Sequence, residues 1–339
     1  MDGEPLKGAR LRALLALFVT GGAAGLVLLQ DVPAPAALAS GPIVAAAGDI
    51  ACDPADPYFK GGNGTSTRCH QAKTANILLT SGASAVLPLG DDQYECAGLA
   101  AFAQSYHPTW GNLKSITYPS IGNHEYETSG GTDCDRTGRA GGYFSYYGSG
   151  GPAPVNCPSG GITPPCGPGG YYSFDIGAWH LIALNANCNK VSGGCGSTSP
   201  QVTWLKSDLA ASHSLCTLAY WHQPRFSSTY SSPNSSMLGA WNALYQAGAE
   251  IVLNGHVHNY QRFAPRTPSG TVSSAKGIRE FIVGTGGMSL GSLGSYRTNM
   301  EAGFKSFGVL QLTLLPASYT WQFVSDTGTI LDSGNFACH

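Results

Sequence analysis

Five short runs of strand-forming residues in this sequence stop at a polar side chain, and this recurrence constrains the fold more than any other feature. Four of the runs reach that side chain through one glycine, and the fifth reaches it directly. Short apolar runs bounded by glycine are typical of buried strands, so the polar residues are expected at strand ends. The five runs cover residues 43–47, 85–89, 116–121, 215–221 and 251–254.

Helical segments lie between these runs. We predict helices over 70–80, 99–106, 201–211 and 237–247, the third with Pro200 at its start. A strand hairpin is expected over 171–185, and the tail alternates apolar and polar residues over 309–324, which favours half-buried antiparallel strands. The sequence therefore predicts an α/β fold of two mixed β-sheets packed face to face with flanking helices, whose functional groups gather at the carboxyl ends of strands.

The polar residues at the strand ends share an ability to bind metals. They are Asp49, Asp91, Asn123, His222, His256 and His258. One aspartate after a glycine is an ordinary turn residue, and a lone pair of histidines is as often structural as it is a ligand pair. Their recurrence at strand ends favours a metal-binding site. Three oxygen donors and three imidazoles suit two adjacent divalent or trivalent ions.

The same stretches resemble the motifs of the calcineurin-like metallophosphoesterases, and within them most closely those of the purple acid phosphatases. The motifs are Gly48-Asp49, Gly90-Asp91-Asp92-Gln93-Tyr94, Gly122-Asn123-His124-Glu125, His222 and Gly255-His256-Val257-His258. Tyr94 occupies the place of the subfamily's tyrosinate ligand, whereas Ala51 replaces the wider family's histidine. Asn259 and Gln261 differ from the residues that the subfamily's motif has at these two positions. The resemblance covers residues 43–334.

The resemblance implies a centre of two metal ions. Asp49, Tyr94 and His258 would bind one ion, Asn123, His222 and His256 would bind the other, and Asp91 would bridge them. Anionic oxygens favour a trivalent ion, whereas imidazoles with an amide oxygen suit a divalent one. The implied cofactors are iron(III) together with iron(II), zinc or manganese.

The activity that the resemblance implies is hydrolysis of phosphomonoesters by in-line attack of a metal-bound hydroxide. His124 resembles the family's outer-sphere histidine, which contacts the phosphate and protonates the leaving alkoxide; the alternative is that it only orients Asn123. We expect Glu125 to hold His124 in place. Two rival functions stay open. One is a phosphodiesterase or nucleotide phosphatase with the same site, and the other is a non-catalytic protein that binds phosphate or metal.

Residues 1–39 have the form of an export signal. Basic residues precede an apolar run over 13–29, and Ala39 ends a small-residue stretch that suits cleavage. The run is short for a membrane span and contains glycines, so we favour cleavage over an uncleaved membrane anchor. We expect a signal peptide over 1–39, one catalytic domain over 40–339, and a secreted or otherwise extracytoplasmic protein.

All ten cysteines lie beyond that segment, and an even number in an exported chain predicts disulfides. We predict local bridges that close glycine-rich loops, Cys52–Cys69, Cys157–Cys166 and Cys188–Cys195. The glycine- and proline-rich stretch over 128–170 is expected to be an insertion stapled by disulfides.

Charge narrows the range of partners. Only 11% of the residues are charged and the formal net charge is -2, which gives no electrostatic footprint for nucleic acid. A small phosphate ester is the expected partner, with no membrane after signal cleavage and the oligomeric state left open. Residues near the motifs that are expected in solvated loops are Asp53, Asp92 and Arg225. Histidines that are expected to be structural or exposed are His70, His107, His180 and His213.

Overall fold

The computed structural model describes residues 41–339, except 149–150, 153–154, 159–164 and 296–297. The predicted export signal lies outside the described residues. By its contacts the chain divides into two units, Met1–Leu38 and Ala39–His339, and every element below belongs to the second. Across the described part of the chain, helices are all too short or too polar to cross a bilayer.

The first sheet has five strands in the order β12-β11-β10-β1-β2. Its strands are β1 (Ile43–Ala47), β2 (Ala85–Pro88), β10 (Gly308–Leu315), β11 (Ser318–Ser325) and β12 (Ile330–Ala337). β1 and β2 are parallel, with Val44 opposite Ala85, whereas β1 pairs with β10 in the antiparallel sense. Parallel strands end at the same edge, so the segments that follow β1 and β2 leave the sheet side by side.

The second sheet has seven strands in the order β3-β4-β5-β6-β8-β7-β9. Its strands are β3 (Tyr172–Ile176), β4 (Trp179–Ala183), β5 (Cys216–Tyr220), β6 (Ile251–Asn254), β7 (Tyr260–Phe263), β8 (Arg279–Val283) and β9 (Met300–Phe304). β4, β5, β6 and β8 are mutually parallel, and the hairpin of β3 and β4 turns at Gly177 as expected.

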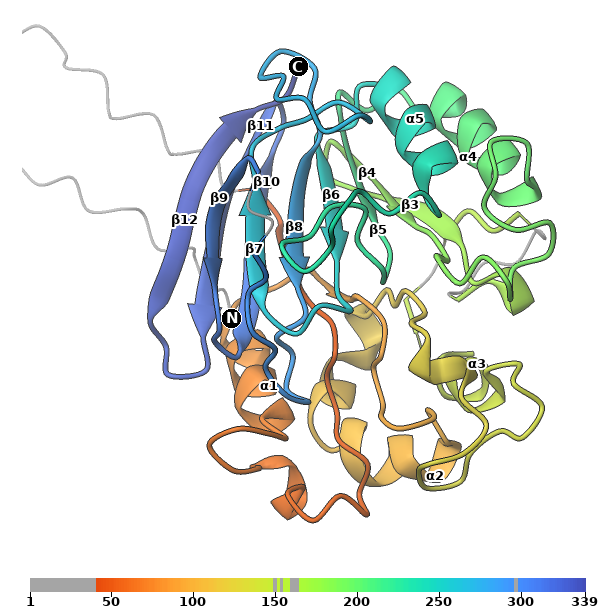
Figure 1. Ribbon diagram of the computed structural model, residues 1–339, viewed down its shortest axis with the longest axis vertical. Coiled ribbons are helices and arrows are strands. Elements are labelled where there is room, and N and C mark those ends of the chain that lie inside the picture. Colours follow the sequence, from red (N-terminus) through yellow and green to blue (C-terminus); the bar gives the residue numbers. More distant parts are fainter. Residues whose placement is uncertain (1–40, 149–150, 153–154, 159–164, 296–297) are drawn as a thin grey trace, which may run out of the picture. The chain divides into compact units, whose positions relative to one another are not determined.

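The helices flank the sheets, as Figure 1 shows. The α-helices are α1 (Gln71–Thr80), α2 (Leu99–Ala101), α3 (Gly141–Tyr147), α4 (Pro200–Ala211) and α5 (Leu238–Gln246). Short helices of other types are η1 (Lys60–Gly62), η2 (Phe102–Tyr106), η3 (Trp110–Ile116), η4 (His124–Tyr126) and η5 (Gly167–Gly169). α4 begins at Pro200 and its cap Ser199 accepts a hydrogen bond from the backbone N–H of Val202.

Two apolar layers hold this arrangement together. Side chains of both sheets, such as Leu310 and Leu253, meet in one core, and α4 and α5 pack on the outer face of the second sheet through residues such as Leu205 and Trp241. Each fully buried aliphatic side chain contributes about 1.5–3 kcal/mol, so these layers dominate the stability of the fold. The predicted architecture of two mixed sheets with flanking helices is confirmed.

The strand predicted over 116–121 is wrong. The segment forms only isolated parallel bridges to β2, through Thr117 and Ser120. Val86 and Pro88 of β2 face this segment, and Pro88 has no N–H to donate, so a continuous ladder cannot form. The backbone N–H groups of Tyr118 and Ser120 still bond to β2, and this contact brings Gly122 and the residues after it to the same sheet edge.

The predicted disulfides are all present, together with two that join distant segments. The five bridges are Cys52–Cys69, Cys96–Cys134, Cys157–Cys166, Cys188–Cys195 and Cys216–Cys338. The stretch over 128–170 contains α3 and η5, and its first cysteine pairs outside the stretch, with Cys96. The predicted helix over 99–106 is α2 followed by the π-helical turn η2.

Candidate metal centre

The residues that follow β1, β2 and β6 turn sharply into the site. Asp49, Asp91 and His256 have positive φ angles of 59°, 51° and 68°, a conformation that is uncommon for residues other than glycine. Such backbone conformations persist where the surrounding structure enforces them, and they are concentrated at functional sites. Two of the three, Asp49 and Asp91, are fully or almost fully buried. The predicted ligands thus stand on strained, well-packed turns.

One half of the site joins Asp91 to two histidines. Nε2 of His222 lies 3.0 Å from Oδ2 of Asp91, and Nδ1 of His256 lies 3.3 Å from the same His222 nitrogen. Each of the three residues offers one ligand atom, and all three atoms lie within 4.8 Å of one another. This spacing is that of donors around one cation.

The other half joins Asp49, Tyr94 and His258. The Tyr94 hydroxyl lies 2.9 Å from Oδ1 of Asp49, 3.2 Å from Oδ2 of Asp91 and 3.0 Å from Nε2 of His258. Nε2 of His258 is also 3.0 Å from Oδ1 of Asp49. The predicted ligands of the first ion therefore meet, and Asp91 lies between the two halves as a bridging ligand would.

The chemistry of these donors fits cations better than hydrogen bonding among themselves. Nδ1 of His222 lies 2.8 Å from the carbonyl oxygen of Leu89, so it carries a hydrogen and leaves Nε2 facing Asp91. In the same way, Nδ1 of His258 contacts the hydroxyl of Ser289 and leaves Nε2 facing Asp49. Metal-binding histidines typically bond their second nitrogen to a carbonyl or another polar group, which fixes the ring.

Electrostatics in the polypeptide support the same conclusion. Burial lowers the pKa of His222, but the nearby charge of Asp91 outweighs it and raises the pKa to about 10. Burial and the neighbouring His222 lower the pKa of His256 to about 4. Burial, then Asp49 and Asp91, raises the pKa of Tyr94 well above its usual value. Negative charge is thus concentrated here, and a phenolate at Tyr94 requires a cation to stabilise it.

Asn123 lies on the His222 side of the site. Its Oδ1 accepts a hydrogen bond of 3.4 Å from Nε2 of Gln223, which also donates to Asn187 at 3.2 Å. Asn187 in turn donates to the carbonyl oxygens of Ile121 and Gly122. This chain of amides fixes the side chain of Asn123. Gln223 and Asn187 could not be predicted from local sequence, because these partners are distant in the chain.

His124 is at the open side of the site. Its backbone N–H donates to Oδ1 of Asp91, and its Nδ1 lies 2.7 Å from the carbonyl oxygen of Glu95. The ring is tilted against that of Tyr94, with centroids 4.3 Å apart, and 28% of the side chain is exposed. Burial lowers the pKa of His124, but Asp91 outweighs it and the net shift is upward. The arrangement leaves Nε2 as the nitrogen that can reach a ligand.

Glu125 does not hold His124, contrary to the expectation. Its Oε2 accepts the backbone N–H groups of Asp91, at 3.0 Å, and Gly122, at 2.7 Å, and its Oε1 accepts that of Asp92 at 2.8 Å. One buried carboxyl group therefore clamps together the turn that carries Asp91 and the turn that carries Asn123. Burial, followed by the charge of Asp91, raises the pKa of Glu125 to about 7.

Three charged residues expected in solvated loops are buried. Asp53, Asp92 and Arg225 are 4%, 0% and 6% exposed. Asp53 accepts hydrogen bonds from Thr132, Asp92 from the hydroxyl of Tyr147, and Arg225 donates to the carbonyl oxygen of Pro268. Their partners lie 43 to 79 residues away in the chain, so local sequence could not reveal the burial.

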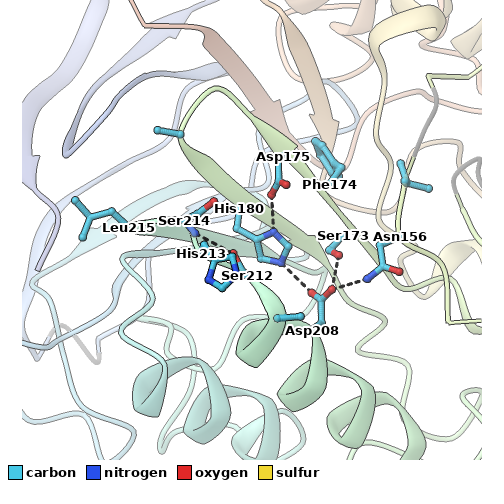
Figure 2. A pocket seen from close by; sticks show the side chains of 13 residues that line it. Asn156, Ser173, Phe174, Asp175, His180, Asp208, Ser212, His213, Ser214 and Leu215 are labelled. Carbon is cyan, nitrogen blue, oxygen red and sulfur yellow. Dashed lines mark hydrogen bonds and ion pairs between the residues drawn. The ribbon is translucent and has the colours of Figure 1, made fainter.

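A larger cavity lies away from these residues. It has a volume of about 900 Å³ and surrounds His180 at the start of β4 (Figure 2). His180 contacts Asp175 at 2.7 Å and Asp208 at 2.9 Å, so its expected structural role is consistent with the contacts. The cavity that borders the candidate metal centre is smaller, about 350 Å³, and is lined by His256 and His258. Convergent donors locate the site better than cavity size.

Comparisons with known proteins agree with this arrangement. No family model matches the chain. Purple acid phosphatase 15 of Arabidopsis thaliana is 30% identical over 204 residues, which are 56% of this chain and 34% of that protein. The chain thus spans about a third of the length of this relative.

Solved structures share the fold. The purple acid phosphatase PPD1 of yellow lupin superposes with a TM-score of 0.66 at 17% identity, over 88% of this chain and 54% of that one. GAP50, described as the anchor in the inner membrane complex of Plasmodium, superposes with a TM-score of 0.58 at 16% identity, over 89% and 90%. The chain has the fold of the calcineurin-like metallophosphoesterases. Within that class, its sequence is similar to the purple acid phosphatases.

Proposed function

We propose that this chain is a phosphatase with a binuclear metal centre, which hydrolyses phosphomonoesters outside the cytoplasm. One observation carries the proposal. Nε2 of His222 and Nε2 of His258 face buried carboxylates from neighbouring strand ends, because the other ring nitrogens are already engaged by Leu89 and Ser289. The similarity to purple acid phosphatases adds independent support for the class of reaction.

The donor set defines which residues would hold each ion. Asp49, Tyr94 and His258 would bind a trivalent ion, for which iron(III) suits the phenolate and carboxylates, and Asn123, His222 and His256 would bind iron(II), zinc or manganese, with Asp91 shared. When bound, such a pair supplies an acidified water and offsets charge on phosphoryl oxygens.

The chain's own residues handle the leaving group. Hydrolysis forms a new P–O bond to water, breaks the ester P–O bond, and releases the alcohol with a proton. His124 donates its Nδ1 hydrogen to Glu95, and its upward-shifted pKa favours a second proton on Nε2. In this proposal His124 gives that proton to the departing alkoxide. Glu125 holds the Asp91 and Asn123 turns in register during the reaction.

The disulfides support a location outside the cytoplasm. All ten cysteines are paired, and stable disulfides are characteristic of oxidising compartments. A secreted protein, released by cleavage after Ala39, is the form that we propose.

Two other functions are tested by the same assay. A phosphodiesterase would turn over bis(p-nitrophenyl) phosphate faster than p-nitrophenyl phosphate. GAP50 shows that a protein described as an anchor can have this fold, and a non-catalytic relative would bind metal without turnover. We expect the monoester to be the faster substrate of the purified, metal-loaded protein; absence of turnover would overturn the proposal.

Variants of two proposed ligands extend the test. We expect Asn123→Ala to lose most activity and to remain folded, while Asn76→Ala on the exposed face of α1 keeps full activity. If Tyr94 binds iron(III), a visible charge-transfer band will be present and will vanish in Tyr94→Phe. An active, colourless enzyme containing only zinc would refute the iron assignment but not hydrolysis.

A further inference from the structure

The two departures from the subfamily's motif, Asn259 and Gln261, join two loops beside the histidine pair. Both residues are fully buried. Nε2 of Gln261 donates to Oδ1 of Asn259 at 2.7 Å, and Oε1 of Gln261 accepts the backbone N–H of Ser228 at 2.8 Å. Asn259 donates to the carbonyl oxygen of Ser292 at 3.2 Å. An amide pair thus links the loop over 227–230 to the loop over 289–294.

Further contacts fix these loops against the proposed ligand His258. The backbone N–H of Gly291 donates to the carbonyl oxygen of His258 at 2.6 Å, and the Ser289 hydroxyl lies 3.0 Å from its ring. The N–H of Gly294 donates to the Ser228 hydroxyl, and a Cβ on Gly294 would lie 1.9 Å from the carbonyl oxygen of Ser228. The loops therefore pack with no space for a side chain between them at this point.

The linked loops line the cavity that borders the metal centre, which is open to solvent. Its volume of about 350 Å³ is near the lower end of the range of about 300–1,000 Å³ that is typical of small-molecule sites. Beside His256, Val257 and His258, the described lining residues that matter here are Thr229, Tyr230, Asn259, Ser289, Leu290 and Ser292. None of these six has a formal charge.

The lining has an apolar side and a polar side. Tyr230 is half-buried against the apolar cluster of Val257, Phe263 and Ile282, and Leu290 is half-exposed in the other loop. Hydroxyl and amide groups complete the lining. An aromatic ring next to hydrogen-bonding groups suits the ring of an uncharged aryl or sugar alcohol. An additional phosphate would find no counter-charge among the described lining residues of this cavity.

We propose that this cavity, which we call the alcohol subsite, selects monoesters of uncharged, ring-containing alcohols over esters that carry further phosphates. The inference rests on the proposed function, because it places the ester's alcohol beside the metal centre. Tyr230 is its main specificity-determining residue, and the Asn259–Gln261 pair positions the loops that carry Tyr230 and Leu290.

The test compares esters with inorganic phosphate in the metal-loaded protein. Tyr230→Ala lowers kcat/KM for phenyl phosphate by about tenfold, the upper range for one aromatic contact, and changes the inhibition constant of inorganic phosphate by less than about twofold. Leu290→Lys raises kcat/KM for adenosine triphosphate relative to phenyl phosphate, because it adds the missing positive charge. Tyr245→Ala, which removes a half-buried tyrosine from α5, leaves both kinetic constants unchanged.

The alcohol subsite would be overturned if Tyr230→Ala weakened kcat/KM for phenyl phosphate and inhibition by inorganic phosphate by the same factor. It would also be overturned if the wild-type protein had a higher kcat/KM for adenosine triphosphate than for phenyl phosphate. Calorimetric binding of phenylphosphonate separates this result from failure of the proposed function. If no ester is turned over, tighter binding of phenylphosphonate than of inorganic phosphate, lost in Tyr230→Ala, still supports the subsite. Equal binding of the two compounds overturns it.

Discussion

The second sheet carries imidazole–carboxylate clusters near both ends of its parallel strands. One cluster centres on His180, the second residue of β4, and the other includes His222, which follows the end of β5. His180 lies opposite Thr217, five residues before His222, so the clusters are separated by roughly 16 Å along the strand direction. Each combines a buried histidine with a buried aspartate, His180 with Asp208 and His222 with Asp91.

The clusters differ in how their histidines are satisfied. Both nitrogens of His180 face carboxylate oxygens, of Asp175 and Asp208, so the protonated ring satisfies them fully (Figure 2). The other oxygen of Asp208 accepts hydrogen bonds from Ser173 and Asn156. At the other end, a carbonyl oxygen engages Nδ1 of His222, and Nε2 faces Asp91 in a group of metal-capable side chains that also includes His256. We call the His180 cluster the closed cluster, because its groups satisfy one another and serve stability. We call the cluster that includes His222 the open cluster, because it can receive a cation.

The largest effect on activity is expected when a ligand of the proposed metal centre is removed. His222→Ala removes an imidazole that contacts Asp91, so we expect activity to fall by at least about a hundredfold and the metal content per chain to drop. Elemental analysis and monoester assays measure both. If His222→Ala kept its full metal content and activity, the cluster that includes His222 would not be a metal site, and the proposed difference from the His180 cluster would be contradicted.

A smaller loss of activity is expected at Glu125, which holds the turns that carry the proposed ligands and is not itself a proposed ligand. Glu125→Gln places an amide where backbone N–H groups now donate, so it weakens the link between the Asp91 and Gly122 turns. We expect a loss of about tenfold to a hundredfold in activity or metal affinity. The control is Glu127→Gln, at an exposed position two residues on, and equal behaviour of the two variants would contradict the clamp.

The smallest effect on activity is expected at the closed cluster. Burial lowers the pKa of His180, but the hydrogen bonds that its ring donates to Asp208 and Asp175 outweigh it and raise the pKa above 6.5. The folded pKa is the higher one, so this stabilisation is complete below about pH 6.5 and is lost as the pH rises through the folded value.

We therefore expect His180→Gln to lower the free energy of unfolding by about 1–3 kcal/mol near pH 5.5 and by less in alkali, with metal content unchanged. Denaturant unfolding over a pH series measures the difference. A difference independent of pH would mean that His180 is not charged in the folded protein.

The sequence was sufficient to predict the parts that rest on local pattern. Strand runs that stop at Asp49, Asp91, His222 and His256 do meet at one place, because parallel strands share an edge. The sequence could not predict Glu125 as a clamp, since two of its partners are backbone groups of a turn more than 30 residues away. In 116–121 the pattern suggested a strand, but a proline removed the donor that a ladder needs.

Anomalous X-ray diffraction from crystals of the metal-loaded protein is the most direct test of the open cluster. We predict two separate metal peaks, one beside Asp49, Tyr94 and His258 and one beside His222 and His256, with Asp91 between them and no peak beside His180. A single peak, or metal bound at His180 in preference, would contradict the account.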